Sequence, residues 1–231
     1  MPDSLSTIAA PIIANILHRM PELLVSLSET FLMVGIALAA AILIGIPVGT
    51  LLYLTRKGGL IERPRLFVLL DFLVNVVRSF PFMILIVALI PVTRFLLGTS
   101  LGTVAASVPL SIVAIVYYGR LVEQSLLDVD HGVITAAVSM GATLPEIVFK
   151  VLLVEARSGI VFGLTIATVS FLSFSTLAGA VGGGGIGDFA IRYGYFRFET
   201  DTMVFTIVVI VLLVQLIQFS GSRVARVIDK R

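Results

Sequence analysis

The stretch "FLMVGIALAAAILIGIPVGTLLYL", residues 31–54, contains no charged side chain and decides the fold. About 20 apolar residues in an α-helix cross the roughly 30 Å hydrocarbon core of a bilayer, and this stretch is long enough to do so. Backbone N–H and C=O groups inside hydrocarbon must be paired, which leaves helices or a closed barrel. A continuous apolar run favours a helix, because barrel strands alternate apolar and polar residues. The sequence therefore predicts an all-α, polytopic membrane protein.

The composition of the whole chain agrees with this prediction. Of its 231 residues 58% are hydrophobic and only 13% are charged, whereas a soluble domain carries about a quarter charged residues. The stretch 64–77 is either an interfacial helix or the first part of a longer, tilted second span. The apolar runs predict about five transmembrane helices, at residues 28–54, 81–97, 103–118, 159–180 and 202–219.

Basic residues predict the orientation of these spans. They are most frequent in the first and third connections and in the C-terminal tail: Arg56, Lys57, Arg63, Arg65, Arg120, Lys150, Arg157, Arg223, Arg226, Lys230 and Arg231. Cytoplasmic loops carry an excess of Lys and Arg, so we expect the C-terminus to be cytoplasmic and the N-terminus to lie outside. The first residues lack the basic region of a signal peptide, and we expect them to be retained.

A helical stretch, "TAAVSMGATLPEIVFKVLLVEA" (residues 135–156), separates the third and fourth spans on the predicted cytoplasmic side. Asp128 and Asp130 are good N-cap residues for a short helix over 133–140, and Gly141 supplies its end. Thr143 and Glu146 fit a capping box that opens a second helix, in which Glu146 and Lys150 can pair. We call residues 131–156 the helical island.

The first island helix is too short to be stable alone, so it must pack against something. Its small residues, among them Ala136, Ala137 and Gly141, allow another surface to come close. From the residues alone, a helical loop packed on its own membrane domain and a docking helix for a partner are equally favoured.

Two further patterns concern helix packing. Gly45 and Gly49 form a small-xxx-small step, which favours close packing with a neighbouring helix over a gating hinge. Asp71, Asn75 and Arg78 share one helix face, where they could line a path or anchor the helix at the cytoplasmic interface. Their position beside the basic first connection favours anchoring.

The glycine-rich stretch "VGGGGIGD", residues 181–188, is a poor nucleotide site. It follows a helix and lacks the Lys and Ser/Thr of a P-loop, so a re-entrant turn built on glycine's conformational freedom is the better interpretation. The chain has no cysteine, and His18 and His131 are far apart in sequence, so we expect no metal site.

Two alternative membrane functions find little support. An intramembrane protease would need a nucleophile with a base inside the bilayer, and we interpret the fourth span's serines as packing hydroxyls: Ser170, Ser173 and Ser175. A self-sufficient secondary transporter would be expected to show coupling carboxylates at mid-membrane or inverted repeats, and neither is visible.

The island resembles the cytoplasmic signature of ABC importer permeases, the EAA loop. Ala136, Ala137 and Gly141 match the signature, as do Val151 and Leu153. The chain departs from it in two places, where Thr135 replaces the usual glutamate and Val154 the usual proline.

The resemblance also extends beyond the island. "GIPVGTLLYLTR" (45–56), "VNVVRSFPFMILIVALIPVTRFLLGTSLG" (74–102) and "AGAVGGGGIGDFAIRYGY" (178–195) are similar to the permeases of bacterial methionine ABC importers. The similarity runs from about residue 25 to the C-terminus.

This resemblance implies a transporter subunit rather than an enzyme. It implies that residues 1–231 form one permease domain, with a coupling loop at about 120–157, in a bacterial inner membrane. The implied partners are a second copy of the chain, two cytoplasmic ATPase subunits that bind ATP and Mg, a periplasmic or lipid-anchored methionine-binding protein and membrane lipid, with no nucleic acid. The chain itself is expected to hold no cofactor.

The resemblance also implies two sets of functional residues. Residues 131–142 would couple the chain to its ATPase, and the implied contact residues are Thr135, Ala136, Ala137, Ser139, Met140, Gly141 and Ala142. Leu177, Ser173 and Met83 are the candidates for the pathway or its gate. Three alternatives remain open: a permease for another small amino acid or solute, a carrier or channel that needs no ATP, and a subunit that only anchors partners.

Overall fold

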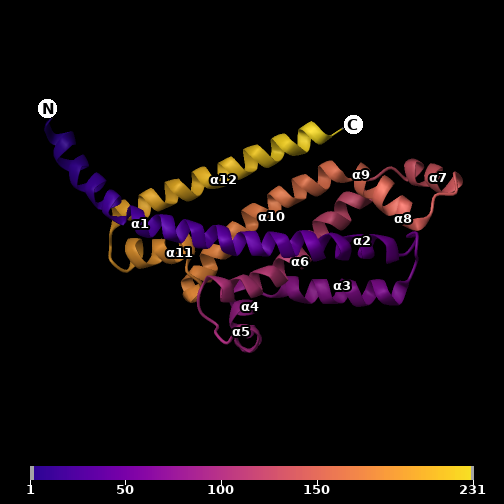
Figure 1. The fold of residues 1–231 in the computed structure, drawn as a ribbon, viewed down its shortest axis with the longest axis horizontal. Helices are drawn as coiled ribbons and strands as arrows, with labels where there is room; N and C mark the ends of the chain where they lie inside the picture. Colours follow the sequence, from indigo (N-terminus) through magenta and orange to yellow (C-terminus); the bar gives the residue numbers. More distant parts are fainter. Residues whose placement is uncertain (1–2, 230–231) are drawn as a thin grey trace. The chain divides into compact units, whose positions relative to one another are not determined.

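The computed structural model describes residues 3–229, with side chains from residue 11 onward (Figure 1). All regular secondary structure in these residues is helical. Lys230 and Arg231, two of the tail charges, lie outside the described residues. The α-helices are α1 (Asp3–Ala40), α2 (Ile46–Thr55), α3 (Pro64–Ser79), α4 (Phe82–Ala88), α5 (Ile90–Leu97), α6 (Thr103–Leu127), α7 (His131–Ser139), α8 (Leu144–Glu146), α9 (Leu153–Glu155), α10 (Arg157–Ala178), α11 (Gly185–Phe189) and α12 (Thr200–Ile228). Four π-helical turns join some of them: η1 (Ala41–Gly45), η2 (Ile147–Leu152), η3 (Gly179–Gly183) and η4 (Ala190–Tyr195).

Four helical stretches within the described residues are long and apolar enough to cross a membrane: Pro11–Thr55, Thr103–Leu127, Arg157–Gly183 and Thr200–Ile228. They contain most or all of the predicted first, third, fourth and fifth spans. The prediction of a continuous second span over 81–97 is wrong, because α4 and α5 are separate helices that meet at Leu89. Pro91 explains the break, since it has no N–H to donate to the carbonyl four residues earlier and its ring clashes with that carbonyl. A fifth span exists only if α3 and α4 are counted together as one broken pair.

The chain divides into two compact units. Unit 1 comprises Met1–Ile36, Phe82–Leu110 and Ser170–Leu216. Unit 2 comprises Ala37–Pro81, Ser111–Val169 and Ile217–Arg231.

The core of unit 1 joins α1, α11, η4 and α12. Leu23 of α1 packs with Ile186, Phe189 and Tyr193, and partly buried side chains of α12 cover this cluster. On α1, Arg19 donates to both carboxylate oxygens of Glu199, at 2.6 and 3.1 Å. This pair lowers the pKa of Glu199 below its ordinary value and fixes the start of α12 against α1.

Unit 2 contains the close helix packing that the glycine pattern predicts. A Cβ added to Gly49 would lie 2.3 Å from the carbonyl oxygen of Gly119 on α6, and one added to Gly45 would lie 3.0 Å from that of Ile115. Such a close approach of the backbones is possible because Gly45 and Gly49 carry no side chain at the contact. The packing interpretation of Gly45 and Gly49 is therefore confirmed.

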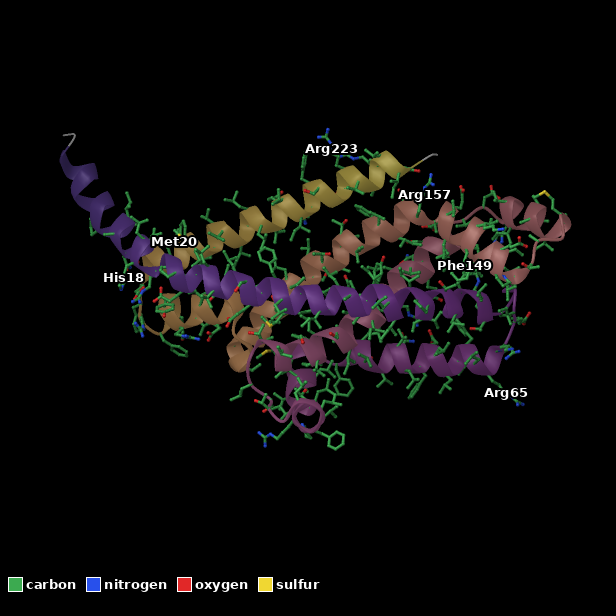
Figure 2. All side chains as sticks on the ribbon, in the orientation of Figure 1. His18, Met20, Arg65, Phe149, Arg157 and Arg223 are labelled. Atoms are coloured by element: carbon green, nitrogen blue, oxygen red, sulfur yellow. The ribbon has the colours of Figure 1, made fainter. Side chains whose placement is uncertain are left out.

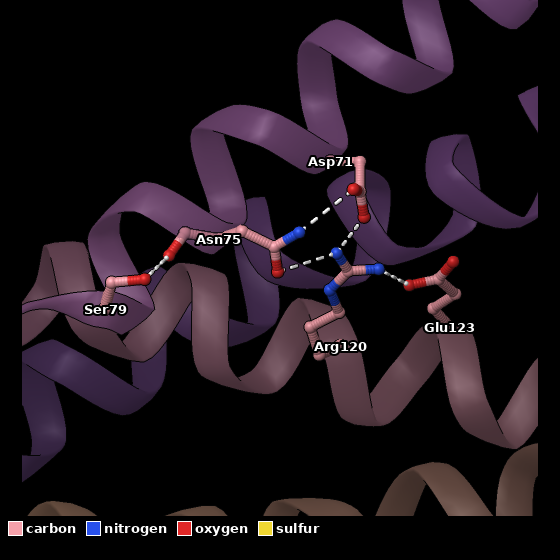
Figure 3. Close-up of polar contacts among 5 residues, drawn as sticks. All are labelled: Asp71, Asn75, Ser79, Arg120 and Glu123. Carbon is pink, nitrogen blue, oxygen red and sulfur yellow. Dashed lines mark hydrogen bonds and ion pairs between the residues drawn. The ribbon is translucent and has the colours of Figure 1, made fainter.

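The polar face of α3 contacts a neighbouring helix, α6 (Figure 3). Arg120 of α6 forms an ion pair with Asp71 and donates to Asn75 at 3.2 Å, and its other arm reaches Glu123 at 2.6 Å. Asp71 and Asn75 thus belong to an ion-pair network within unit 2, and their role as an anchor at the cytoplasmic interface stays a prediction. The sequence could not reveal this network, because Arg120 belongs to α6 and was assigned to a loop.

Candidate functional site

The first helix of the island begins and ends where its caps predict. The Asp130 carboxylate accepts a hydrogen bond of 2.6 Å from the N–H of Gly132, and α7 starts at His131. At the other end Gly141 has φ of 79°, a conformation that glycine adopts without strain. The predicted short helix is confirmed, and it runs from His131 to Ser139 instead of from Val133 to Met140.

The second helix opens on the predicted polar pairs. The Glu146 carboxylate accepts from the N–H of Thr143 at 3.1 Å and from its hydroxyl at 2.8 Å. Lys150 donates to the same carboxylate at 3.0 Å. The bonds from Lys150 and Thr143 lower the pKa of Glu146 to about 2, so the group is ionised at neutral pH.

The implied coupling residues do not all face the same way. Ala137 is buried at 4% exposure together with Ile134, and this inner face of α7 packs against η2. Ala142 is half-buried. The remaining residues of the set are exposed: Thr135, Ala136, Ser139, Met140 and Gly141.

The island carries exposed apolar side chains, and two of them, Val138 and Phe149, were not among the predicted coupling residues. Phe149 is 69% exposed (Figure 2), Met140 is 81% exposed and Val138 is 50% exposed. Phe149 is adjacent to the exposed Lys150 and three residues after Glu146. Residues three apart lie on the same helix face, so this spacing indicates that Phe149 lies on the polar face of the helix. Exposed apolar side chains beside charged residues are typical of a surface that contacts another protein.

The glycine-rich segment of unit 1 forms a sharp turn between α10 and α11. Gly182, Gly184 and Gly185 have φ between 74° and 87°, which other residues rarely adopt. The N–H of Gly185 donates to Glu29 Oε2 at 2.7 Å, and the N–H of Ile186 donates to Thr30 Oγ1 at 2.8 Å. Because the chain's own carboxylate occupies this helix end, the geometry offers no cradle for a phosphate.

Glu29 and Thr30 were not among the predicted functional residues. The only signal for Glu29 in the sequence is a carboxylate inside the predicted first span, since charged groups there are rare and need partners.

A pocket of about 350 Å³ in unit 1 brings together two of the three pathway candidates. Ser173 and Leu177 both line it, and Leu177 is 41% exposed. Met83 lies on α4 and does not line this pocket. The other lining residues are Leu172, Thr176, Ala180, Gly187, Ala190, Ile191, Ile210 and Val214. The pocket is apolar except for hydroxyl groups.

The polar side chains of the described residues offer no obvious catalytic or metal-binding arrangement. No three His, Cys, Asp or Glu side chains in that part of the chain lie close enough together to hold a metal ion. In α10, the Ser175 hydroxyl donates to the carbonyl of Leu172 at 2.7 Å, as expected for a packing hydroxyl.

Comparison with protein families decides the class of the protein. Residues 41–231 match the model described as "Binding-protein-dependent transport system inner membrane component". The chain belongs to this family. It is a multi-pass permease subunit of a bacterial inner membrane and not a catalytic enzyme.

Similar proteins cover almost the whole chain. A probable D-methionine transport system permease protein of Vibrio cholerae is 47% identical, over 90% of this chain and 93% of its own length. The methionine import system permease protein of Bacillus subtilis is 41% identical, over 78% and 82% respectively.

Solved structures confirm the fold. A chain of the MetNI methionine ABC transporter, in a structure described as inward facing, has a TM-score of 0.89 and 42% identity. The match covers 92% of this chain and 98% of that one. A chain from an amino acid ABC transporter, with 16% identity and a TM-score of 0.76, shares the fold alone.

Proposed function

We propose that the chain is the permease subunit of an ATP-driven importer that carries L-methionine, and also D-methionine, into the cell by alternating access. The observation that carries this proposal is the near full-length similarity to methionine permeases, at 47% identity to the Vibrio cholerae protein. Both compact units act within one permease domain. The substrate crosses as the domain alternates between two arrangements.

ATP is bound and hydrolysed outside this chain. We propose that two copies of the chain form the pathway and that each seats its island on one cytoplasmic ATPase subunit, which holds ATP and Mg. The exposed residues Ala136 and Met140 support such docking, since a loop packed only on its own domain would bury them. A periplasmic or lipid-anchored binding protein delivers the methionine.

Basic side chains support a cytoplasmic position for the island. Arg65 and Arg157 lie toward the end of unit 2 that carries Phe149 (Figure 2). An excess of Arg and Lys marks the cytoplasmic side. The N-terminus would then lie outside.

The pocket at Leu177 and Ser173 is proposed as part of the pathway and its gate. Its apolar lining suits the thioether side chain of methionine, because apolar surface is favourably removed from water there. Met83, which does not line the pocket, would contribute elsewhere along the path.

Uptake of labelled L-methionine by cells tests this function. The cells express the chain together with the ATPase and the binding protein. Wild type should accumulate methionine in an energy-dependent manner, and Ala136→Arg should lose at least 90% of that uptake, about a tenfold loss, because a long cation blocks the docking surface. Glu62→Arg is the matched control, because it adds the same cation to another exposed position.

The outcomes separate the alternatives. Uptake that persists without ATP would indicate a carrier or channel. Uptake of another amino acid but not methionine would replace the substrate and keep the class. Equal uptake by wild type and Ala136→Arg would overturn the coupling assignment.

A further inference from the structure

The turn between α10 and α11 is held by side chains from α1, far away in the sequence. Glu29 accepts from the N–H of Gly185, and Thr30 accepts from the N–H of Ile186. Both acceptors are separated from their donors by 156 residues. On the other side of the turn, the N–H of Gly102 donates to the carbonyl of Gly182 at 2.9 Å.

Helix α11 cannot hold this position by itself. Together with η4, into which it continues, it covers only residues 185–195, and no side chain of its own N-cap accepts from its first N–H groups. A helix of that length is unstable alone, and its first N–H groups need acceptors. Glu29 is half-buried and supplies one of these acceptors, and the buried Thr30 supplies another. The stability of α11 therefore depends on α1.

The fit between the turn and α1 is also steric. A Cβ on Gly184 would lie 2.7 Å from Glu29 Oε2, and a Cβ on Gly185 would lie 2.8 Å from Thr30 Oγ1. The glycines let the backbone reach the two acceptors directly. Thr30 is buried at 1% exposure, so its position is fixed by packing.

Helix α11 in turn forms one wall of the pocket at Leu177 and Ser173, which is proposed as part of the pathway. Gly187 of α11 lines that pocket together with Leu177 and Ser173 of α10. A Cβ on Gly187 would lie 2.3 Å from the carbonyl oxygen of Thr176, so the two backbones are in direct contact. Any shift of α11 must change the pocket at Leu177.

We infer that Glu29 is a positioning residue for transport: through the Gly185 N–H, its carboxylate holds α11 in the place that keeps the pathway closed at Leu177. This inference rests on the proposed transport function. Glu29 touches no substrate in this account. Its contribution is to keep the wall of the pocket in place between transport cycles.

Loss of the acceptor should make the permease leak. In proteoliposomes holding the permease and its ATPase, Glu29→Ala should raise the ATP-independent efflux of labelled methionine about tenfold, the size expected when a charge-assisted hydrogen bond is removed. Glu29→Gln keeps an oxygen acceptor and should stay within about twofold of wild type. With the binding protein added, Glu29→Ala should also hydrolyse more ATP per methionine transported.

The neighbouring carboxylate Glu22 provides the control. It lies on the same helix, its side chain is 43% exposed, and it reaches Arg19 only at 4.0 Å. Glu22→Ala should therefore show the same ATP-independent methionine efflux as wild type. Thr30→Val removes the second acceptor with little change in shape, and it keeps the test available should Glu29→Ala fail to reach the membrane. It should leak less than Glu29→Ala but more than Glu22→Ala.

Three results would overturn the inference. They are a tight, coupled Glu29→Ala variant at normal membrane levels, a Glu29→Gln variant that leaks as much as Glu29→Ala, and a Glu22→Ala variant that leaks equally. Wild type that fails to accumulate methionine with ATP would overturn the proposed function instead. The efflux comparison would still decide the role of Glu29, because efflux needs no ATP.

Discussion

The helical island of unit 2 and the glycine turn of unit 1 both contain helices too short to stand alone, yet they are stabilised in opposite ways. The island is capped by its own neighbours in sequence, such as Asp130 for Gly132 and Glu146 for Thr143. The glycine turn is capped by Glu29 and Thr30 of α1. The island leaves apolar side chains exposed, whereas α11 is almost entirely buried.

This difference indicates that the two regions have different functions. A surface that must meet a partner is best preformed by local bonds, with its apolar side chains free to be covered. In the pathway proposed above, α11 forms a wall that is held by contacts with residues far away in the sequence. The following predictions test whether the two regions differ in this way.

The largest effect is expected in the glycine turn. Gly187→Ala places a Cβ 2.3 Å from the Thr176 carbonyl oxygen, and backbone cannot move aside as a flexible side chain can. We expect a loss of about 3 kcal/mol in stability, measured as a lower melting temperature in detergent and less protein in the membrane. Gly35→Ala is the matched control, because no atom lies within 4 Å of its added Cβ. A Gly187→Ala protein as stable as Gly35→Ala would contradict the tight packing.

A substitution on the exposed face of the island should weaken ATPase binding and leave the stability of the permease unchanged. Phe149 is 69% exposed, so Phe149→Ser should leave the melting temperature of the isolated permease unchanged. If Phe149 belongs to the docking surface, the same variant should bind the ATPase about tenfold more weakly in a pull-down titration, as for an aromatic hot spot. Phe72→Ser, at a 61% exposed position on α3, is the control. Unchanged ATPase binding would confine docking to residues 131–142.

The ion pair between Asp71 and Arg120 should have an intermediate effect. It joins residues far apart in the sequence, as in the glycine turn, but it is partly exposed, as in the island. The side chains of Asp71 and Arg120 are 33% and 20% exposed, so solvent weakens their attraction. A double-mutant cycle with Asp71→Ala and Arg120→Ala should give a coupling energy of about 1 kcal/mol in thermal unfolding. Coupling near zero would show that the pair is incidental to the packing of α3 on α6.

The smallest effect is expected at Glu146. Its pKa is about 2 in the folded chain, below the roughly 4.3 of an unfolded glutamate. A lowered folded pKa means that the stabilisation is present above pH 4.3 and is lost as the pH falls through about 2. Carboxyl NMR of a labelled chain should therefore show Glu146 ionised at pH 4. A titration midpoint near 4.3 would contradict the capping contacts of Glu146. Because the side chain is exposed, Glu146→Gln should hardly change the melting temperature at pH 7.

The sequence predicted the regions that depend on neighbouring residues. The caps at Asp130, Thr143 and Glu146 join residues two or three positions apart, and the close packing at Gly45 and Gly49 follows a spacing of four. Apolar runs likewise predicted most of the spans, because each span satisfies its own backbone.

What the sequence missed depends on pairs that no local rule connects. Glu29 and Gly185 meet across 156 residues, and Asp71 meets Arg120 across 49. The break at Leu89 could have been predicted from Pro91, but apolar composition outweighed it. Exposure of Phe149 required knowing which face of the second island helix packs inward.

The central claim is that this chain moves methionine only when the island is engaged by an ATPase. The most direct measurement is methionine accumulation in proteoliposomes that contain the permease, its ATPase and the binding protein, with and without ATP. The account predicts accumulation above the equilibrium concentration with ATP for wild type, and none for Ala136→Arg although it inserts normally. Accumulation by Ala136→Arg equal to that of wild type, or accumulation by wild type without ATP, would contradict the account.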